Sequence, residues 1–566
     1  MNSRENGSGV TVKIVLSVSI LVLAVSVLVL AVSVLLLVAR FDWVDSLSHR
    51  LERLSAAYLL DQMDDKDFTW LNGPGAPGHA TKILARWVQV VPAGSSECWL
   101  AMGDGKDEKD RKSSDFGSCP YDFLVRAVVT KGAKCPGIEV EVAFADGRTI
   151  RDKVLALRKR NFRPQPGLDK VQVCQVRLNR GKNPLSITFP DKKTIDVTSR
   201  WPEGAGPRNI VAFGDTGCRA DDHQRCVKEK WRFAQLAKQV VDDTRPNSVI
   251  PDLVLYLGDF MYVKFDAWDT WKASFFDPAA PLLSAAPWIM VRGNHERCGE
   301  FGDTPHGYYL FFDTGAAKNC ENNTTAGDLE LTDTYAVDLS DTHRVIVADS
   351  AISFATDVRD LREKEAIEVA DADQAVFDEV KRMLGQVKHL AHGQTGKTVW
   401  LATHVPVFAL EECNKDDWKK KKYDSTKKCS IISSDDIYDA DSPETSAMMR
   451  VAWNSVEMVK EGTGISTILA ADRHLFQAID AGDMSPLQIT VGTGGVNLDP
   501  HPLADAESPP CRPKERVEAP PSNLRSERVP GFARNWRHCS LEAFGYLVAK
   551  NTNGGTFKMT FKALSE

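Results

Sequence analysis

The pattern of apolar and polar residues gives the chain three regions of different character, and the first is continuously apolar. From residue 14 to residue 39 there is no charged side chain. About 20 apolar residues in a helix span the hydrocarbon core of a bilayer. The run is longer than the roughly 7–15 apolar residues of a cleaved signal peptide. It predicts an uncleaved transmembrane signal-anchor at 14–39.

Charges beside this span predict its orientation. Arg4 and Lys13 precede it, and Asp42 and Asp45 follow it. Because basic residues stay on the cytoplasmic side, residues 1–13 are expected in the cytoplasm. The rest of the chain is then exported, to the periplasm or the cell exterior.

Small residues recur within the span at intervals of seven, as in Ser17, Ala24 and Ala31. Such a stripe allows close helix–helix packing, so one expectation is a homodimer through this helix. The alternative is that Ser and Ala are simply common in such segments. Residues 40–80 are interpreted as a stalk or linker, because leucines at heptad-like spacing give way to a segment containing Gly and Pro.

The second region, 81–200, consists of short strand-like runs separated by polar turns, which predicts a small β-sandwich-like domain. In the third region, 207–566, apolar strands alternate with helical stretches such as 226–242 and 359–391. This alternation is typical of an α/β fold with a largely buried sheet.

Composition narrows the functional classes. The chain has 566 residues and a net charge of −7, with no long basic run, so nothing indicates nucleic-acid binding. All of its 12 cysteines follow the apolar span, which predicts disulfides in an exported region. Proximity in sequence suggests the pairs Cys218–Cys226, Cys298–Cys320, Cys413–Cys429 and Cys511–Cys539.

Candidate chemistry gathers where the strands of the third region end. Five apolar runs are each followed by a turn that carries acids, amides or imidazoles. Because ligands of open α/β sheets bind beyond the carboxyl ends of the strands, we expect these groups to share one rim. In chain order they are Asp215, Asp259 with Tyr262, Asn294 with His295, His404, and Asp472 with His474.

These side chains are oxygen and nitrogen donors, which suit Fe, Mn, Zn or Mg better than the metals that thiolates select. They are too many for one ion. Two ions about 3.5–4 Å apart form a clamp for in-line displacement at phosphorus. The predicted cofactors are therefore two metal ions (Fe, Mn or Zn), and the predicted partner is a small phosphorylated substrate.

The motifs GDTG, GDFMY, GNHE and THVP, followed by a His-bearing turn, resemble the calcineurin-like metallophosphoesterase superfamily over roughly residues 207–500. Tyr262, Gly217 and the preceding β-domain are similar to its purple acid phosphatase branch. The contexts GDTGCR and APWIMVRGNHERC look like exported bacterial members. The resemblance implies a β-sandwich flanked by helices, preceded here by a small all-β domain and a transmembrane helix.

The resemblance also implies roles for the matching residues. A metal-activated hydroxide would attack phosphorus. His295 would protonate the leaving group. The residues themselves agree with this role, because the imidazole of GNHE is not needed as a metal ligand and imidazoles in general have a pKa suited to acid catalysis. The structural alternatives are that the aspartates cap turns or helices and that Tyr262 packs in the core without binding a metal. The implied metal ligands are Asp215, Asp259, Tyr262 and His474 for the first ion, and Asp259, Asn294 and His404 for the second.

The last turn departs from the family pattern. Family members usually have Gly-His-x-His, whereas this chain has Ala471-Asp472-Arg473-His474. Asp472 then occupies the position of the first histidine, where its oxygen would favour Mn, Mg or Fe over Zn. The alternative is a structural acid bonded to a neighbour.

The leading hypothesis is a membrane-anchored, exported phosphoester hydrolase with a dinuclear metal centre. One alternative is a phosphodiesterase or nucleotide pyrophosphatase that uses the same site. The other is a non-catalytic, membrane-anchored binding protein derived from the fold.

Overall fold

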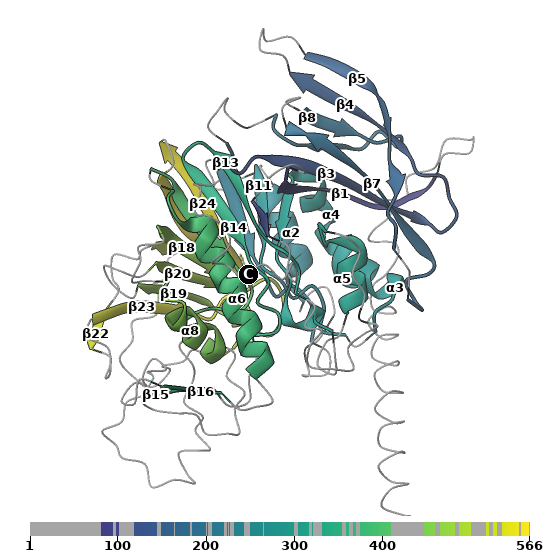
Figure 1. Ribbon diagram of the computed structural model, residues 1–566. Coiled ribbons are helices and arrows are strands. Elements are labelled where there is room, and N and C mark those ends of the chain that lie inside the picture. Colours follow the sequence, from purple (N-terminus) through teal and green to yellow (C-terminus); the bar gives the residue numbers. More distant parts are fainter. Residues whose placement is uncertain are drawn as a thin grey trace, which may run out of the picture. The chain divides into compact units, whose positions relative to one another are not determined.

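The computed structural model (Figure 1) describes most residues from 81 to 564. The chain divides into two units, 1–58 and 59–566, and every described residue lies in the second. The segments predicted at 1–13, 14–39 and 40–80 thus lie outside the description. No helix within the described part is long and apolar enough to cross a membrane. Apart from gaps of four residues or fewer, the other undescribed segments are 101–117, 144–148, 243–249, 299–303, 321–330, 409–445, 459–463, 481–485, 500–516, 520–524 and 529–534.

The larger sheet has ten strands, and a parallel trio forms its centre. The trio is β10 (Asn209–Phe213), β11 (Leu253–Tyr256) and β12 (Trp288–Met290), in which almost every residue is buried. Burial on both faces explains their uninterrupted apolar sequences. The remaining strands, in sheet order, are β21 (Val517–Ala519), β25 (Thr556–Ala563) and β24 (Gly545–Asn553) on one side, and β1 (Ile83–Pro92), β3 (Tyr121–Thr130), β7 (Val171–Asn179) and β6 (Arg158–Lys159) on the other.

The second sheet has nine strands with a parallel centre of four. These four are β14 (His343–Val347), β17 (Thr398–Ala402), β18 (Ile465–Ala470) and β20 (Leu487–Val491). Aromatic side chains of both sheets meet between them: Phe476 stacks on Phe561 with ring centres 4.4 Å apart. The outer strands are β2 (Trp99–Leu100) and β13 (Thr334–Ser340) at one edge, and β19 (Phe476–Asp480), β23 (Asn535–Leu541) and β22 (Arg525–Arg528) at the other.

Strands from residues 81–200 extend both large sheets. β1 pairs in parallel with β12, and β2 pairs with β13, so hydrogen bonds cross the predicted boundary near residue 200. The division into domains at 81–200 and 207–566 stays a prediction. The other strands of this part form a four-stranded sheet of β5 (Thr149–Ala156), β4 (Gly137–Ala143), β8 (Pro184–Thr188) and β9 (Thr194–Asp196).

Helices pack on the large sheets, which gives the mixed α/β architecture that the alternation predicts. α6 (Gln374–Ala391) contacts β13 and β14 with a buried stripe that includes Val380, Leu384 and Val387. The helix expected at 359–391 starts only at Gln374, because β15 (Val358–Leu361) and β16 (Ala366–Val369) pair as a hairpin before it. The other helices are α2 (Phe233–Val241), α3 (Trp268–Trp271), the π-helical turn η5 (Lys272–Phe276), α4 (Asp277–Ala285), α5 (Pro305–Phe311) and α8 (Ser446–Ser455).

Four disulfides connect described cysteines. The predicted pairs Cys218–Cys226 and Cys298–Cys320 are confirmed. Cys98–Cys119 and Cys135–Cys174 escaped prediction, because they join strands or loops that only the fold brings together. The predicted pair Cys413–Cys429 and residue Cys511 lie outside the description, although Cys539 is disulfide-bonded.

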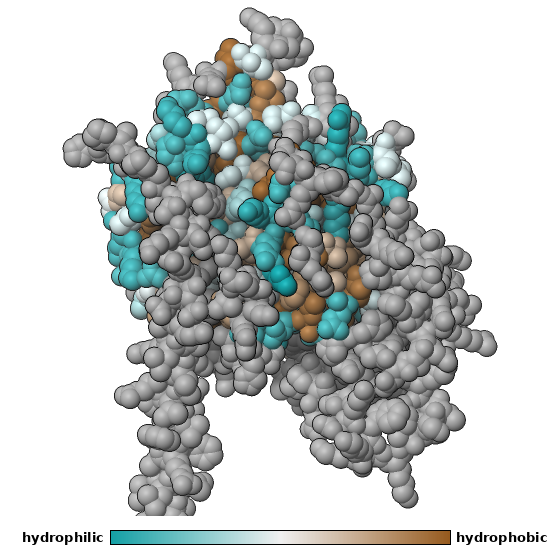
Figure 2. All heavy atoms as spheres, turned by 180° about the vertical axis from the view of Figure 1, so that it is seen from behind, coloured by the Kyte–Doolittle hydropathy of each residue, from teal (hydrophilic) through white to brown (hydrophobic). Residues whose placement is uncertain are grey.

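Hydrophilic side chains cover much of the described surface in Figure 2, and hydrophobic ones show mainly in the lower middle of that face, with some near its top. Ile150 and Phe265 are the exposed large hydrophobic residues among those described. Most apolar surface is therefore buried between the sheets and under the helices.

Candidate metal centre

Three strand ends carry an aspartate in the left-handed backbone region. The φ angles are 57° at Asp215, 58° at Asp259 and 67° at Asp472. Asp tolerates this region better than most residues, yet each instance costs about 1–3 kcal/mol and such residues cluster at functional sites. The chain thus turns sharply after β10, β11 and β18, in the same way each time.

Glycines let the backbone approach these turns closely. A Cβ atom on Gly293 would lie 2.1 Å from Asp259 Oδ1, and one on Gly492 would lie 2.8 Å from Asp215 Oδ2. Real Cβ atoms do not come so near other atoms, so only glycine fits these two positions without displacement.

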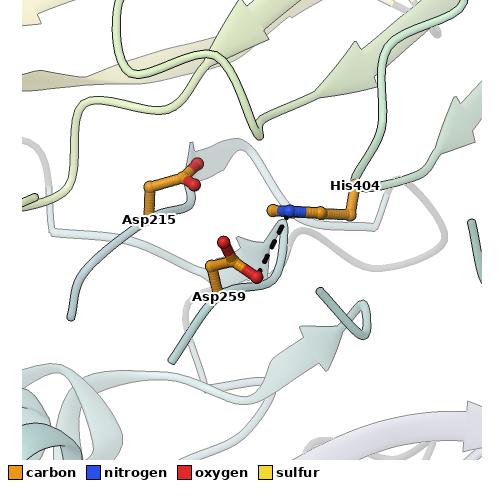
Figure 3. Close-up of side chains that lie close together, drawn as sticks. All are labelled: Asp215, Asp259 and His404. Atoms are coloured by element: carbon orange, nitrogen blue, oxygen red, sulfur yellow. Dashed lines mark ion pairs between the residues drawn. The ribbon is translucent and has the colours of Figure 1, made fainter. Parts of the chain in front are cut away.

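Asp215, Asp259 and His404 form the centre of the site (Figure 3). One donor atom from each lies within 4.8 Å of the others, and all three side chains are buried. His404 Nε2 lies 3.3 Å from Asp259 Oδ1 and 3.6 Å from Asp472 Oδ1. β10 and β11 of one sheet and β17 and β18 of the other therefore deliver groups to one point.

The imidazole of His404 is oriented by the backbone. Its Nδ1 lies 2.7 Å from the carbonyl oxygen of Leu257. A carbonyl can only accept, so Nδ1 carries the proton and Nε2 faces the carboxylates with its lone pair when the ring is neutral. Burial lowers the pKa of His404, but the carboxylates of Asp259, Asp215 and Asp472 together raise it more, and the net pKa lies well above its usual value. The carboxylates thus attract positive charge to this point.

A second group of side chains adjoins Asp215. Tyr262 donates its hydroxyl to Asp215 Oδ1 at 2.7 Å, and the same hydroxyl lies 3.1 Å from His474 Nε2. His474 Nε2 is also 3.5 Å from Asp215 Oδ1, while its Nδ1 lies 3.4 Å from Asp499 Oδ1. His474 therefore repeats the arrangement of His404, with Nδ1 on a supporting acceptor and Nε2 toward a carboxylate.

Neighbouring carboxylates also shift the pKa values of His474 and Tyr262. Burial lowers the pKa of His474, but Asp215 and Asp499 raise it more, to about 10. Burial and then Asp215 raise the pKa of Tyr262 well above its usual value, so its hydroxyl is protonated and donates.

Asn294 and His295 come from the short 3-10 helix η6 (Asn294–Glu296) after β12. The Asn294 amide lies 2.8 Å from His404 Nε2, and with its nitrogen turned to Asp259 it donates to both carboxylate oxygens at 3.2 Å. The backbone N–H of His295 donates to Asp259 Oδ1 at 3.1 Å. Its ring Nε2 is 4.0 Å from Asp259 Oδ2, and its side chain is 19% exposed, whereas that of His404 is fully buried.

Two residues without a predicted role support this arrangement. Glu296 is buried and accepts hydrogen bonds from the backbone N–H groups of Asp259, Phe260 and Gly293. It thereby joins the turn after β11 to the turn after β12. Asp499 contacts both the ring Nδ1 and the backbone N–H of His474. Asp499 had a sequence signal, because it follows β20 and the glycine-rich run that starts at Gly492, a sixth strand end of the same kind.

The structure brings every predicted site residue into one connected cluster. Each makes at least one of the contacts given above with another member. The roles of these residues as ligands or acid stay predictions. The members are Asp215, Asp259, Tyr262, Asn294, His295, His404, Asp472 and His474.

Comparison with known families agrees with this geometry. Residues 208–422 match the family model of the calcineurin-like phosphoesterases, which supports a metallophosphoesterase domain over that range. Asp472 and His474 lie beyond the matched residues. No curated protein matches the chain. The family generally binds two metal ions, and the cluster of Asp215, Asp259 and His404 is compatible with that property.

Proposed function

We propose that this chain hydrolyses phosphoesters with two metal ions held in the cluster described above. One observation carries the proposal: two imidazoles, His404 and His474, are oriented through Nδ1 so that Nε2 faces buried carboxylates. This orientation is the usual one for metal-ligating histidines. The donor set of carboxylates, imidazoles and an amide fits Fe, Mn or Zn.

The contacts support a division of the donors into two groups. Asp215, Tyr262 and His474 contact one another and would hold one ion. Asn294, His404 and Asp472 would hold the other. Asp259 faces the second group and lies close to Asp215, so it would bridge the two ions. When bound, such ions act as Lewis acids on phosphoryl oxygens and activate water for attack on phosphorus.

His295 would act as the general acid. It is the most exposed of the three site imidazoles, so an ester can reach it. Its Nε2, 4.0 Å from Asp259 Oδ2, makes no close contact with that carboxylate. As the bond from phosphorus to the leaving oxygen breaks, a proton from His295 would neutralise that oxygen.

Asp472 and Tyr262 would influence which two metals the site binds. Asp472 adds a carboxylate where the family has an imidazole, which favours harder ions such as Mn and Fe. Tyr262, with Gly217, supports a purple acid phosphatase-like assignment, in which the tyrosine binds ferric iron. The disulfides support an exported location. The anchor at 14–39, its cytoplasmic N-terminus and its homodimer stay predictions.

The test is an assay of the detergent-solubilised full chain, loaded in turn with Mn, Fe and Zn. Substrates are an aryl phosphate and an aryl phosphodiester, and metal content is measured by elemental analysis. We expect two metal equivalents and turnover of the monoester. Faster turnover of the diester would favour the phosphodiesterase alternative. No turnover of either ester and no bound metal would leave only a non-catalytic binding protein.

The matched variants are Asp259→Asn and Asp378→Asn. Asp259 is buried at the centre of the site, while Asp378 is exposed on α6. We expect Asp259→Asn to lose both metal equivalents and about a thousandfold or more in kcat/KM, because several kcal/mol of transition-state stabilisation would be lost. Asp378→Asn should resemble the wild type. A visible absorption band with iron would support ligation by Tyr262.

A further inference from the structure

Arg219 lies beside the candidate metal centre and has no part in the mechanism above. It follows Cys218 in the loop after β10. Its guanidinium carbon lies 5.5 Å from the centre of the Tyr262 ring. The same ring is 4.3 Å from the ring of His295, and its hydroxyl contacts Asp215. The side chain of Tyr262 therefore lies next to a cation, to the proposed acid and to a proposed metal ligand.

The charge of Arg219 is not balanced within the described part of the chain. No described carboxylate forms an ion pair with its guanidinium, whose contact there is the face of Tyr262. Arg292, which precedes the GNHE motif, differs: it is fully buried and pairs with Asp349 at 3.1 Å. Arg292 therefore has a structural role, whereas Arg219 is partly exposed and accessible to an anion.

The backbone of Arg219 is held in place by described neighbours. The preceding residue, Cys218, forms a disulfide with Cys226 over a sequence separation of 8 residues. The backbone N–H of Arg219 donates to Gln224 Oε1 at 2.7 Å, and its carbonyl accepts the N–H of Gln224. Gln224 in turn donates to the carbonyl of Gly495 at 2.7 Å. Arg219 thus starts from a fixed backbone position.

We propose that Arg219 binds non-bridging phosphate oxygens and makes the site prefer phosphomonoesters to phosphodiesters. The inference rests on the proposed hydrolase function. Guanidinium groups match phosphate oxygens in pairs. Near neutral pH a monoester carries one more negative charge than a diester, and it has three non-bridging oxygens instead of two. Arg219 therefore interacts more strongly with a monoester.

The test compares Arg219→Gln and Arg219→Lys with Arg232→Gln in the full, metal-loaded chain. Arg232 precedes α2, where its guanidinium bonds to Gln235. Substrates are an aryl phosphate and an aryl phosphodiester with the same leaving group, and inorganic phosphate serves as a competitive inhibitor. We expect Arg219→Gln to lower kcat/KM for the monoester about 10- to 100-fold and for the diester less than about threefold. The inhibition constant of phosphate should rise in parallel.

Arg219→Lys should fall between Arg219→Gln and the wild type, and Arg232→Gln should match the wild type. Metal content should be unchanged in all variants. An unchanged ratio of monoester to diester turnover in Arg219→Gln, or equal losses on both esters, would overturn the inference and leave the hydrolase function intact. A wild type that hydrolyses neither ester would instead overturn the proposed function.

Gln224→Ala tests the fixed position of Arg219 separately. It removes the side-chain bonds to Arg219 and Gly495 and leaves every charge in place. We expect a smaller loss of monoester preference in the same direction as Arg219→Gln. A preference equal to that of the wild type would contradict the part of the inference that assigns Gln224 a positioning role.

Discussion

His343 and His404 are two buried histidines at opposite ends of neighbouring strands. His343 begins β14, His404 follows β17, and the two strands are parallel with His343 opposite Thr398. His404 sits at the carboxyl ends, between the Leu257 carbonyl and two carboxylates. His343 sits at the amino ends, with Trp400 and Phe557 rings 4.2 and 4.4 Å away. Neither of its ring nitrogens bonds to a described residue.

Burial is equal at these two histidines, yet the pKa values move in opposite directions. Burial lowers the pKa of His343 to about 3, because the opposing effect of Asp338 is smaller than that of burial. At His404 the carboxylates outweigh burial and the pKa rises. Burial alone therefore does not identify a functional histidine. The neighbouring groups do, and they differ because the left-handed aspartates occupy one end of the strands only.

Within this comparison, the largest effect is expected from a variant in which the surroundings of His404 become more like those of His343. Asp472→Ala removes a carboxylate 3.6 Å from His404 Nε2. We expect loss of one of two metal equivalents and about a hundredfold or more in kcat/KM. Asp472→His should restore two equivalents with a shift in preference toward Zn. Elemental analysis and metal-dependent assays provide the measurements, and full metal content in Asp472→Ala would remove Asp472 from the site.

A smaller change adds one methyl group at the strand ends. In Gly293→Ala the new Cβ would lie 2.1 Å from Asp259 Oδ1, so Asp259 has to shift. We expect a loss of about 1–3 kcal/mol in the free energy of unfolding and weaker metal binding. Gly307→Ala is the matched variant, because its Cβ would meet the Trp271 ring at 1.9 Å. It should lower Tm without changing metal content per folded chain, and equal metal loss in both would contradict the expectation.

The smallest change at neutral pH is His343→Phe. It removes two polar atoms that have no described partner, so we expect a gain of about 1 kcal/mol in the free energy of unfolding at pH 7. The folded-state pKa of about 3 is below the usual 6.5. The unfolded chain therefore binds the proton first, and wild-type stability falls as pH drops from 6.5 toward 3.

The variant lacks this loss, so its advantage should grow by about 2 kcal/mol at pH 5, from 1.36 kcal/mol per pKa unit. Urea denaturation in EDTA measures it without metal effects. His392→Phe at an exposed position is the control. An advantage that does not change between pH 7 and pH 5 would show that His343 is not neutral in the folded chain.

The sequence predicted which residues lie close together, because these residues follow strand ends; their roles stay predictions. Asp215, Asp259, Asn294, His404 and His474 each come after an apolar run, and such runs fix where a buried strand stops. Sequence did not reveal that Asp215, Asp259 and Asp472 share a left-handed backbone, because Asp is also an ordinary turn and capping residue.

Other features depend on contacts that are remote in sequence. Glu296 bonds to the backbone of Asp259, and Gln224 to that of Gly495, and neither pairing has a local signal. The pairing of β1 with β12 was also not predictable, because the sequence pattern of one strand does not indicate which strand lies beside it. The hairpin before α6 escaped prediction because its short strands adjoin a genuinely helical pattern.

The donors of the candidate centre come from both sheets and are spread along the chain from Asp215 to His474. An unfolded chain cannot hold them together, since closing such long loops without a core is entropically costly. Metal uptake by the proposed centre would then follow folding rather than guide it, unlike in small zinc domains. A chain that crosses a membrane unfolded would arrive empty and acquire its ions only where it folds, so the metals available in that compartment would decide which ions it carries.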